Sequence, residues 1–156
     1  MAKLEINISG VGELLKKLTK YRDSLEDTIN ELLEKITNEG VSITNVQVNQ
    51  ISYSEFRNPV TGWYEPTGAL ENSIVGVYDP VSHVGIITSN QPYAIFVEYG
   101  TGVYSENGTH GEEGWWYTAE GDSHWTKGQP GRQFMYKAAQ ELKEEVPRIA
   151  KEVFKK

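Results

Sequence analysis

Residues 25–48 read LEDTINELLEKITNEGVSITNVQV, and the fold depends on how this stretch is interpreted. Its first half predicts a helix, because apolar residues recur three or four positions apart, at Leu25, Ile29, Leu32, Leu33 and Ile36. The second half is ambiguous. Asn38-Glu39-Gly40 is typical of a helix end, and the β-branched residues that follow are typical of a strand. Local propensity alone therefore favours a strand over residues 41–49.

Two further elements are expected upstream of this stretch. Apolar and polar residues alternate over 4–8, which predicts a short strand that ends at Ser9-Gly10. A first amphipathic helix is then expected over residues 11–20. The second helix would begin at a cap formed by Asp23 or Ser24, since their side-chain oxygens can accept hydrogen bonds from free backbone N–H groups.

Downstream, turn residues separate several short elements. Residues 52–69 are rich in Pro and Gly and predict a loop. Residues 74–78 and 84–87 predict a hairpin around the turn Asp79-Pro80-Val81-Ser82. Residues 93–99 predict a short helix, because a polar cap and a proline precede them and Gly100 follows. A third strand is the competing interpretation of that segment.

The last third combines a long loop with a helix. Residues 100–131 are rich in glycine and tryptophan, and a loop of that length in a compact domain is normally functional or disordered. Within it, residues 115–118 and 123–126 flank Glu120-Gly121-Asp122 and predict a small hairpin. An amphipathic helix follows from Phe134 to Val153. Pro147 should kink that helix or start a new turn.

Composition restricts the class of protein. The chain has 156 residues, 38% of them hydrophobic and 24% charged, which is globular composition and fits one domain over residues 1–156. No apolar run approaches the ~20 residues of a membrane span, and no secretion signal is recognised. Residues 41–126 carry one basic and 10 acidic groups. This middle part should repel nucleic acid, because phosphate binding needs clustered Lys and Arg.

Motifs for catalysis, metals and cofactors are missing. Cysteine is absent, and neither a phosphate-binding loop, a nucleophile elbow nor a zinc helix occurs. Asp122-Ser123-His124 has the residue types of a hydrolase triad, but such triads form by spatial convergence and not by adjacency. His110 beside Glu112 and Glu113 is interpreted as an exposed polar loop. We therefore predict no enzyme activity, no metal site and no cofactor.

Aromatic residues in the predicted loops are the strongest functional signal. Trp63, Tyr64, Trp115, Trp116, Tyr117 and Trp125 all lie in loop or loop hairpin. Aromatic side chains displayed this way suit protein interfaces, carbohydrate binding or stacking on single strands. The alternative is that they fold back onto their own sheet. The acidic surroundings disfavour nucleic acid.

Four fragments occur in an order that is similar to one family. They are Thr67-Gly68-Ala69-Leu70 with Ser73-Ile74, Ser89 to Gly102, Gly114-Trp115-Trp116-Tyr117, and Gly128-Gln129-Pro130 with Phe134-Met135. Together they resemble the tail-completion or head–tail joining proteins of lambda-like tailed phages and prophages. The resemblance covers nearly the whole chain. It favours one long helix past Gly40 to about Asn49, against local propensity.

The resemblance implies an α+β fold in which a small antiparallel sheet packs with a long N-terminal helix and a C-terminal helix. It also implies a non-catalytic virion protein, assembled in the host cytoplasm, that forms a ring at the phage neck or tail end. The subunit number would be six, and the partners would be other neck or tail proteins. DNA would pass through an acidic lumen without specific binding. A carbohydrate- or host-surface-binding tail module is the alternative function.

The family-like motifs and the aromatic loop together give the candidate interface. Its residues are Tyr93, Phe96, Glu98, Tyr99, Thr101, Trp115, Trp116, Tyr117, Trp125, Gln129, Arg132 and Phe134. Within this set we expect Glu98 and Arg132 to form an ion pair across the base of the long loop, within or between subunits; the alternative is that both are solvated charges.

Overall fold

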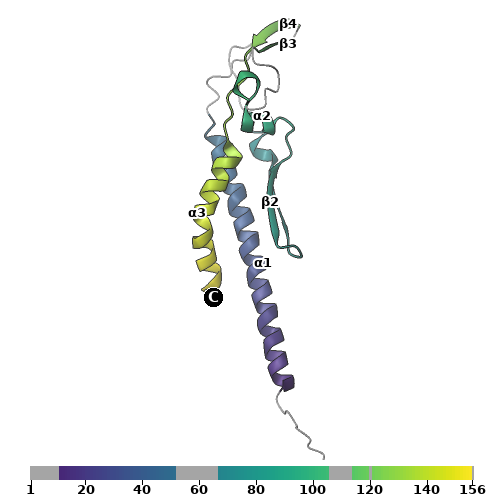
Figure 1. The fold of residues 1–156 in the computed structure, drawn as a ribbon, viewed down its shortest axis with the longest axis vertical. Helices are drawn as coiled ribbons and strands as arrows, with labels where there is room; N and C mark the ends of the chain where they lie inside the picture. The colour runs from purple at the N-terminus through teal and green to yellow at the C-terminus, as the bar shows by residue number, and fades with distance from the viewer. Residues whose placement is uncertain (1–10, 52–66, 106–113, 120, 156) are drawn as a thin grey trace, which may run out of the picture.

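The computed structural model of the protein describes residues 11–51, 67–105, 114–119 and 121–155 (Figure 1). The strand predicted over residues 4–8 and most of the loop predicted over 52–69 lie outside these residues, as do His110, Glu112 and Glu113. The described elements follow one another as α1 (Val11–Asn49), the 3-10 turn η1 (Glu71–Ser73), β1 (Ile74–Asp79), β2 (Val84–Ser89), α2 (Ala94–Tyr99), the 3-10 turn η2 (Gly102–Tyr104), β3 (Trp115–Ala119), β4 (Asp122–Thr126) and α3 (Phe134–Phe154).

Helix α1 is one uninterrupted element of 39 residues. The predicted break between a helix over 11–20 and a second helix from Asp23 or Ser24 is therefore wrong. Both residues are good caps, but neither prevents a helix from continuing, and no proline lies in this part of the chain. Arg22 and Asp23, side by side at the expected break, pair with each other at 2.7 Å on the helix surface. The prediction of a helix to Asn49 is confirmed.

Gly40 marks close packing and not a helix end. A Cβ atom at this position would overlap the side chain of Ile87 in β2 and lie 2.8 Å from the Leu142 side chain in α3. Because Gly40 lacks that atom, the three elements can meet at one point along α1. The glycine therefore weakens α1 locally but allows α3 and the hairpin to pack against it.

Strands β1 and β2 form the predicted hairpin. They pair antiparallel from Ile74 opposite Ser89 to Asp79 opposite Val84. The turn is built as expected, since the Asp79 side chain accepts hydrogen bonds from the backbone N–H of Val81, at 2.9 Å, and from the Ser82 hydroxyl. The hairpin lies along α1 (Figure 1), with its glycines close to Thr37.

Strands β3 and β4 form the second predicted hairpin, and it stands apart from the first. Trp116 pairs with Trp125 and Tyr117 with His124 in its antiparallel register. Figure 1 shows this hairpin at one end of the molecule, beyond the ends of α1 and α3. The α+β class is confirmed, with the strands arranged as two separate two-stranded hairpins.

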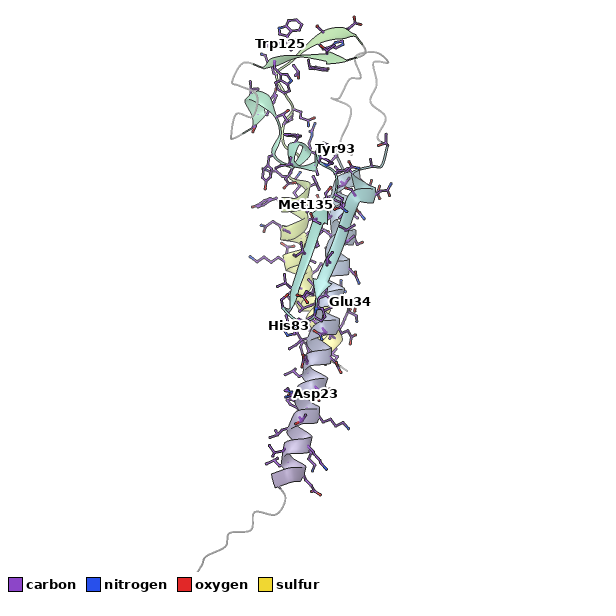
Figure 2. All side chains as sticks on the ribbon, turned by 90° about the vertical axis from the view of Figure 1, so that its right-hand side faces the viewer. Asp23, Glu34, His83, Tyr93, Trp125 and Met135 are labelled. Carbon is purple, nitrogen blue, oxygen red and sulfur yellow. The ribbon has the colours of Figure 1, made fainter. Side chains whose placement is uncertain are left out.

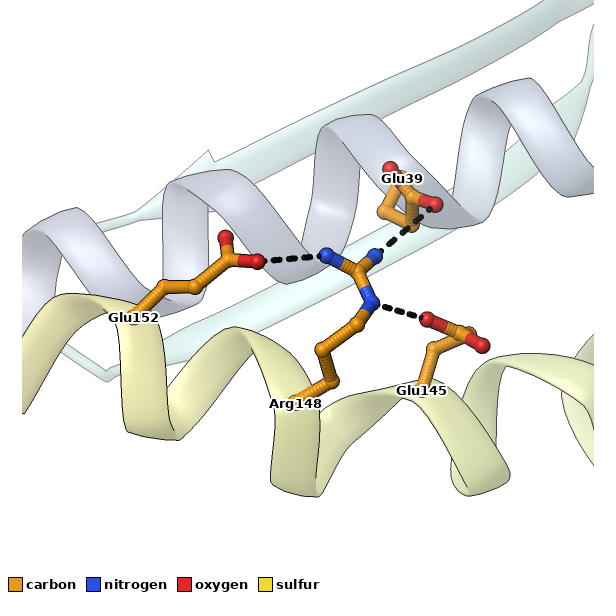
Figure 3. Close-up of polar contacts among 4 residues, drawn as sticks. All are labelled: Glu39, Glu145, Arg148 and Glu152. Atoms are coloured by element: carbon orange, nitrogen blue, oxygen red, sulfur yellow. Dashed lines mark hydrogen bonds and ion pairs between the residues drawn. The ribbon is translucent and has the colours of Figure 1, made fainter.

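Helix α3 runs antiparallel to α1 and packs along its C-terminal half (Figure 1). It continues through Pro147 as one element, and the kink expected at this proline stays a prediction. Beside that proline, the Arg148 guanidinium contacts Glu145 and Glu152 of α3 and reaches Glu39 of α1 at 3.5 Å (Figure 3). The carboxylates of Glu145, first, and Glu152 raise the pKa of Arg148. Because these ion pairs are exposed, they contribute little to the stability of the α1–α3 contact.

The hydrophobic core lies between the C-terminal end of α1, helix α2 and the start of α3. The buried cluster comprises Val48, Ile51, Leu70, Ile74, Ala94 and Phe134. Phe134, the first residue of α3, is only 1% exposed. A second buried group further along the α1–α3 contact includes Ile43, Ala138, Ile149 and Val153. The body of the protein is therefore stabilised from the middle of α1 to its C-terminal end.

Candidate functional site

Two of the sequence motifs meet as paired backbone segments, which we call the clasp: residues 97–103 and residues 127–133. The N–H of Thr101 donates to the carbonyl of Gln129 at 2.8 Å, and the N–H of Val103 donates to that of Lys127 at 3.0 Å. At the other end, the N–H of Arg132 donates to the carbonyl of Val97 at 2.8 Å. The clasp joins α2 to the segment that leads into α3, and so it closes the base of the long loop.

Glycines allow the two clasp segments to lie this close. Gly128 has a φ of 97°, and a Cβ atom there would overlap the carbonyl oxygen of Thr101. Gly100 has a φ of 80°, and its Cβ atom would lie 2.6 Å from the backbone nitrogen of Gly131. Both positions require left-handed backbone and close approach, which glycine alone provides without strain. The glycines of these motifs are thus explained by the fold of the chain itself.

Glu98 is the buried polar residue at the centre of the clasp. Its side chain is 6% exposed, and its two carboxyl oxygens accept hydrogen bonds from the N–H groups of Met135, at 2.8 Å, and Tyr136, at 3.0 Å. These N–H groups belong to the first turn of α3, where no carbonyl of the same helix can satisfy them. Gln133, the residue at the helix start, has left-handed backbone and provides no side-chain cap. Glu98 therefore caps α3 from another element.

Glu98 was predicted to form an ion pair with Arg132, whereas the structure shows its carboxyl group bonded to the backbone of α3. The structure brings the two residues close in the fold through the backbone, since Val97 accepts from Arg132 and Glu98 accepts from Gln133. The Glu98 carboxyl group accepts hydrogen bonds from two N–H groups of α3. A contact between the Glu98 and Arg132 side chains stays a prediction.

The predicted interface residues separate into three groups by their exposure. Glu98 and Phe134 are buried, and Thr101, Trp115, Gln129 and Arg132 are half-buried. The buried pair stabilises the fold of the chain and offers no surface to a partner in this conformation. The exposed group comprises Tyr93, Phe96, Tyr99, Trp116, Tyr117 and Trp125. Ile95, Val103 and Tyr104 are exposed beside them.

The exposed group lies on α2 and on both faces of the β3–β4 hairpin, because Trp116 and Tyr117 are neighbours in β3, and we call it the aromatic surface. Tyr93 and Trp125 mark its two parts in Figure 2. The side chains of Trp116, 67% exposed, and Trp125 contact each other edge to face, with ring centroids 5.5 Å apart. Trp115 instead packs close to Gly102 in the clasp. An open hollow of about 320 Å³ lies beside α2, lined by Ile95, Tyr99 and Met135 among others.

The polar residues that were considered for catalysis are arranged in a different way from a triad. Ser123 and His124 are neighbours in β4, so their side chains point to opposite faces of the hairpin. The His124 ring lies 5.4 Å from the Tyr117 ring. Within the described ranges, no group of three or more His, Asp or Glu residues could hold a metal ion. Over the same residues, no helix has the length and apolar character needed to cross a membrane.

The clasp segments were recognised as motifs and Glu98 and Arg132 were expected to meet across the loop base, but the backbone pairing of the two segments was not predicted. The capping role of Glu98 was also missed, because the capped N–H groups lie 37 and 38 residues further along the chain. A signal was present: the helix that begins at Phe134 has no Ser, Thr, Asp or Asn at its start. A buried helix start without a local cap requires a distant acceptor.

No protein-family model, curated protein or solved structure matches this chain.

Proposed function

We propose that this protein is a structural subunit that completes a phage tail or joins it to the capsid, acting as one member of a ring. The observation that supports this role is the aromatic surface between α2 and the β3–β4 hairpin. Large aromatic side chains are enriched in protein interfaces, where they bury much area at low cost in side-chain entropy. An exposed surface of this kind is unusual on a protein that remains a monomer.

A ring of identical subunits needs two different surfaces on each subunit. The aromatic surface provides one of them. The clasp provides a firm base for it, because backbone hydrogen bonds and the Glu98 cap fix α2 and β4 relative to α3. A pre-ordered surface loses less conformational entropy when it binds.

Charge is consistent with a ring that surrounds DNA without retaining it. The net charge is −7, and residues 41–126 contain Arg57 as their one basic residue. Phosphate groups would meet few cations on this part of the chain, so contacts that retard DNA would be weak. Six subunits would form the ring, with other neck or tail proteins above and below it.

Electron microscopy of the purified protein, alone and mixed with tail tubes, tests the proposal. We expect rings at the ends of tubes. Trp116→Ala should abolish ring formation while changing the free energy of unfolding by less than about 0.5 kcal/mol, because the side chain is exposed. Tyr136→Ala is the matched control, since it removes an exposed aromatic side chain outside the aromatic surface. A protein that stays monomeric even with tail tubes contradicts the proposal. So does a Trp116→Ala variant whose stability collapses while the molecules that remain folded assemble normally.

A carbohydrate-binding tail module is the second candidate, favoured by the exposed edge-to-face pair of Trp116 and Trp125. Aromatic faces that are open to solvent can stack on sugar rings. Calorimetric titration with cell-wall sugars separates the two functions. Saturable heat that Trp125→Ala removes, without rings on tail tubes, would favour this second function.

A further inference from the structure

The first part of α1 extends beyond the body of the protein as a single helix, and we call residues 12–27 the arm. Figure 1 shows it continuing past the C-terminal end of α3, and Figure 2 shows Asp23 on the arm beyond the hairpin tip at His83. Every residue of the arm is exposed. At a rise of 1.5 Å per residue, the arm is about 24 Å long.

The arm carries an apolar stripe that no described residue covers. Leu14, Leu18, Tyr21 and Leu25 follow one another at intervals of four, three and four residues, which places them on one face of the helix. With Leu15, they are between 40% and 70% exposed. Further along α1 the same face continues through Ile29, Leu32 and Ile36 toward the region that α3 covers. The apolar face of α1 is therefore covered along α3 and uncovered on the arm, beyond the end of α3.

Charges on the arm are divided into two halves. Residues 16–22 contain four basic and no acidic residues, and residues 23–27 contain three acidic and no basic residues. The boundary lies at Arg22 and Asp23, which pair with each other. A parallel second arm would place like charges side by side. An antiparallel arm would place the basic half of each copy against the acidic half of the other.

We propose that the arm binds the arm of a second copy of this chain, antiparallel and centred near Asp23. In this arrangement Leu18 of one copy lies level with Thr28 of the other, each five residues from the centre. The second copy would also continue the line of α3, which already runs antiparallel to α1. This contact has two-fold symmetry and uses the end of the molecule opposite the aromatic surface, so it does not depend on the proposed function.

Sedimentation of the full chain over a range of concentrations tests the pairing. We expect reversible dimers, and Leu18→Asp should weaken them by about tenfold or more, because it places a charge within the apolar contact between the two arms. Thr19→Asp is the matched control, since it adds the same charge on the neighbouring residue, away from the stripe; it should leave the dimers intact. Measurement in the Trp116→Ala background excludes ring contacts. A chain that is monomeric at every concentration, as expected if its own first ten residues cover the stripe, overturns the proposal.

Charge reversal tests the orientation. One variant reverses the basic half through Lys16→Glu, Lys17→Glu and Lys20→Glu, and another reverses the acidic half through Asp23→Lys, Glu26→Lys and Asp27→Lys. Each should weaken the dimer, and the combination of all six should restore it. Parallel arms would not give that restoration, because like charges would still face each other in the combined variant.

Cysteine cross-linking gives the register, and the natural chain contains no cysteine to interfere. An equimolar mixture of Leu18→Cys and Thr28→Cys chains should form the mixed disulfide in preference to either homodimer. Disulfides that form mainly between identical positions would show parallel arms and overturn the antiparallel arrangement.

Discussion

The clasp and the arm are opposite ends of one molecule, and they differ in what their residues are used for. In the clasp, backbone N–H groups and the Glu98 carboxyl group form hydrogen bonds within the chain, and the glycines lie close to backbone atoms of the facing segment. In the arm, the apolar side chains have none among the described residues, and exposed apolar stripes need a partner from elsewhere. Substitutions in the clasp should therefore change folding, and substitutions in the arm should change association.

Replacing a glycine by alanine at each end gives the largest expected contrast in the free energy of unfolding. Gly128→Ala should lower the free energy of unfolding by about 3–5 kcal/mol, because the new methyl group would overlap the Thr101 carbonyl oxygen and the backbone would remain at an unfavourable φ. Gly12→Ala in the arm meets no atom within 4 Å and should be neutral or stabilise by up to ~1 kcal/mol. Urea unfolding followed by circular dichroism measures both.

Equal effects from the two alanine variants would contradict this division of roles. A mild effect of Gly128→Ala would mean that the clasp opens at little cost. The aromatic surface would then lack the firm base that the proposed function gives it.

Glu98 provides the next test, because its removal takes the cap from α3 without changing a glycine. Glu98→Ala should destabilise the protein by about 2–4 kcal/mol, since it leaves the N–H groups of Met135 and Tyr136 without acceptors in a buried place. Glu98→Gln retains one oxygen acceptor and should lose less. Hydrogen exchange at those two amides, compared with the unfolding free energy, reports the cap directly.

Glu141→Ala is a suitable control, because it removes an exposed glutamate further along α3 that bonds to Gln47 at 2.9 Å. It should change stability far less than Glu98→Ala. If the two substitutions cost the same, the buried carboxyl group is not the cap that the structure indicates.

Features encoded by neighbouring residues were predicted from the sequence. The turn from Asp79 to Ser82, the hairpin around Gly121 and the helix that starts at Phe134 all depend on local patterns, and the structure confirms each. The continuation of α1 past Gly40 needed the family resemblance, because local propensity favoured a strand. Gly40 is explained only once Ile87 and Leu142 are seen to converge on it.

The candidate site was predicted in part. The motifs were recognised, but their pairing depends on contacts about 30 residues apart, which no local pattern reveals. Phe134 was assigned to an interface because it is a large aromatic residue in a motif; the structure gives it a place in the core. The arm was interpreted as an ordinary amphipathic helix, since periodicity shows which face is apolar and not what covers it.

The smallest expected effect concerns the β1–β2 turn, which lies near the border between the covered and uncovered parts of α1 (Figure 2). The Ser82 hydroxyl, followed by the Val81 N–H, lowers the pKa of Asp79 below its usual 3.8. The stabilisation of the turn by the ionised Asp79 carboxylate is therefore fully present above pH 3.8 and is lost as pH falls through the lower pKa of the folded state. Hydrogen exchange at the amides of Val81 and Ser82, measured from about pH 6 to about pH 2 and corrected for intrinsic rates, should show lower protection at acid pH. Asp79→Asn should remove that pH dependence, and clasp amides such as that of Thr101 are the internal reference. Loss of protection at the clasp before the turn would show that acid weakens the two regions in the opposite order and that Asp79 does not control the turn.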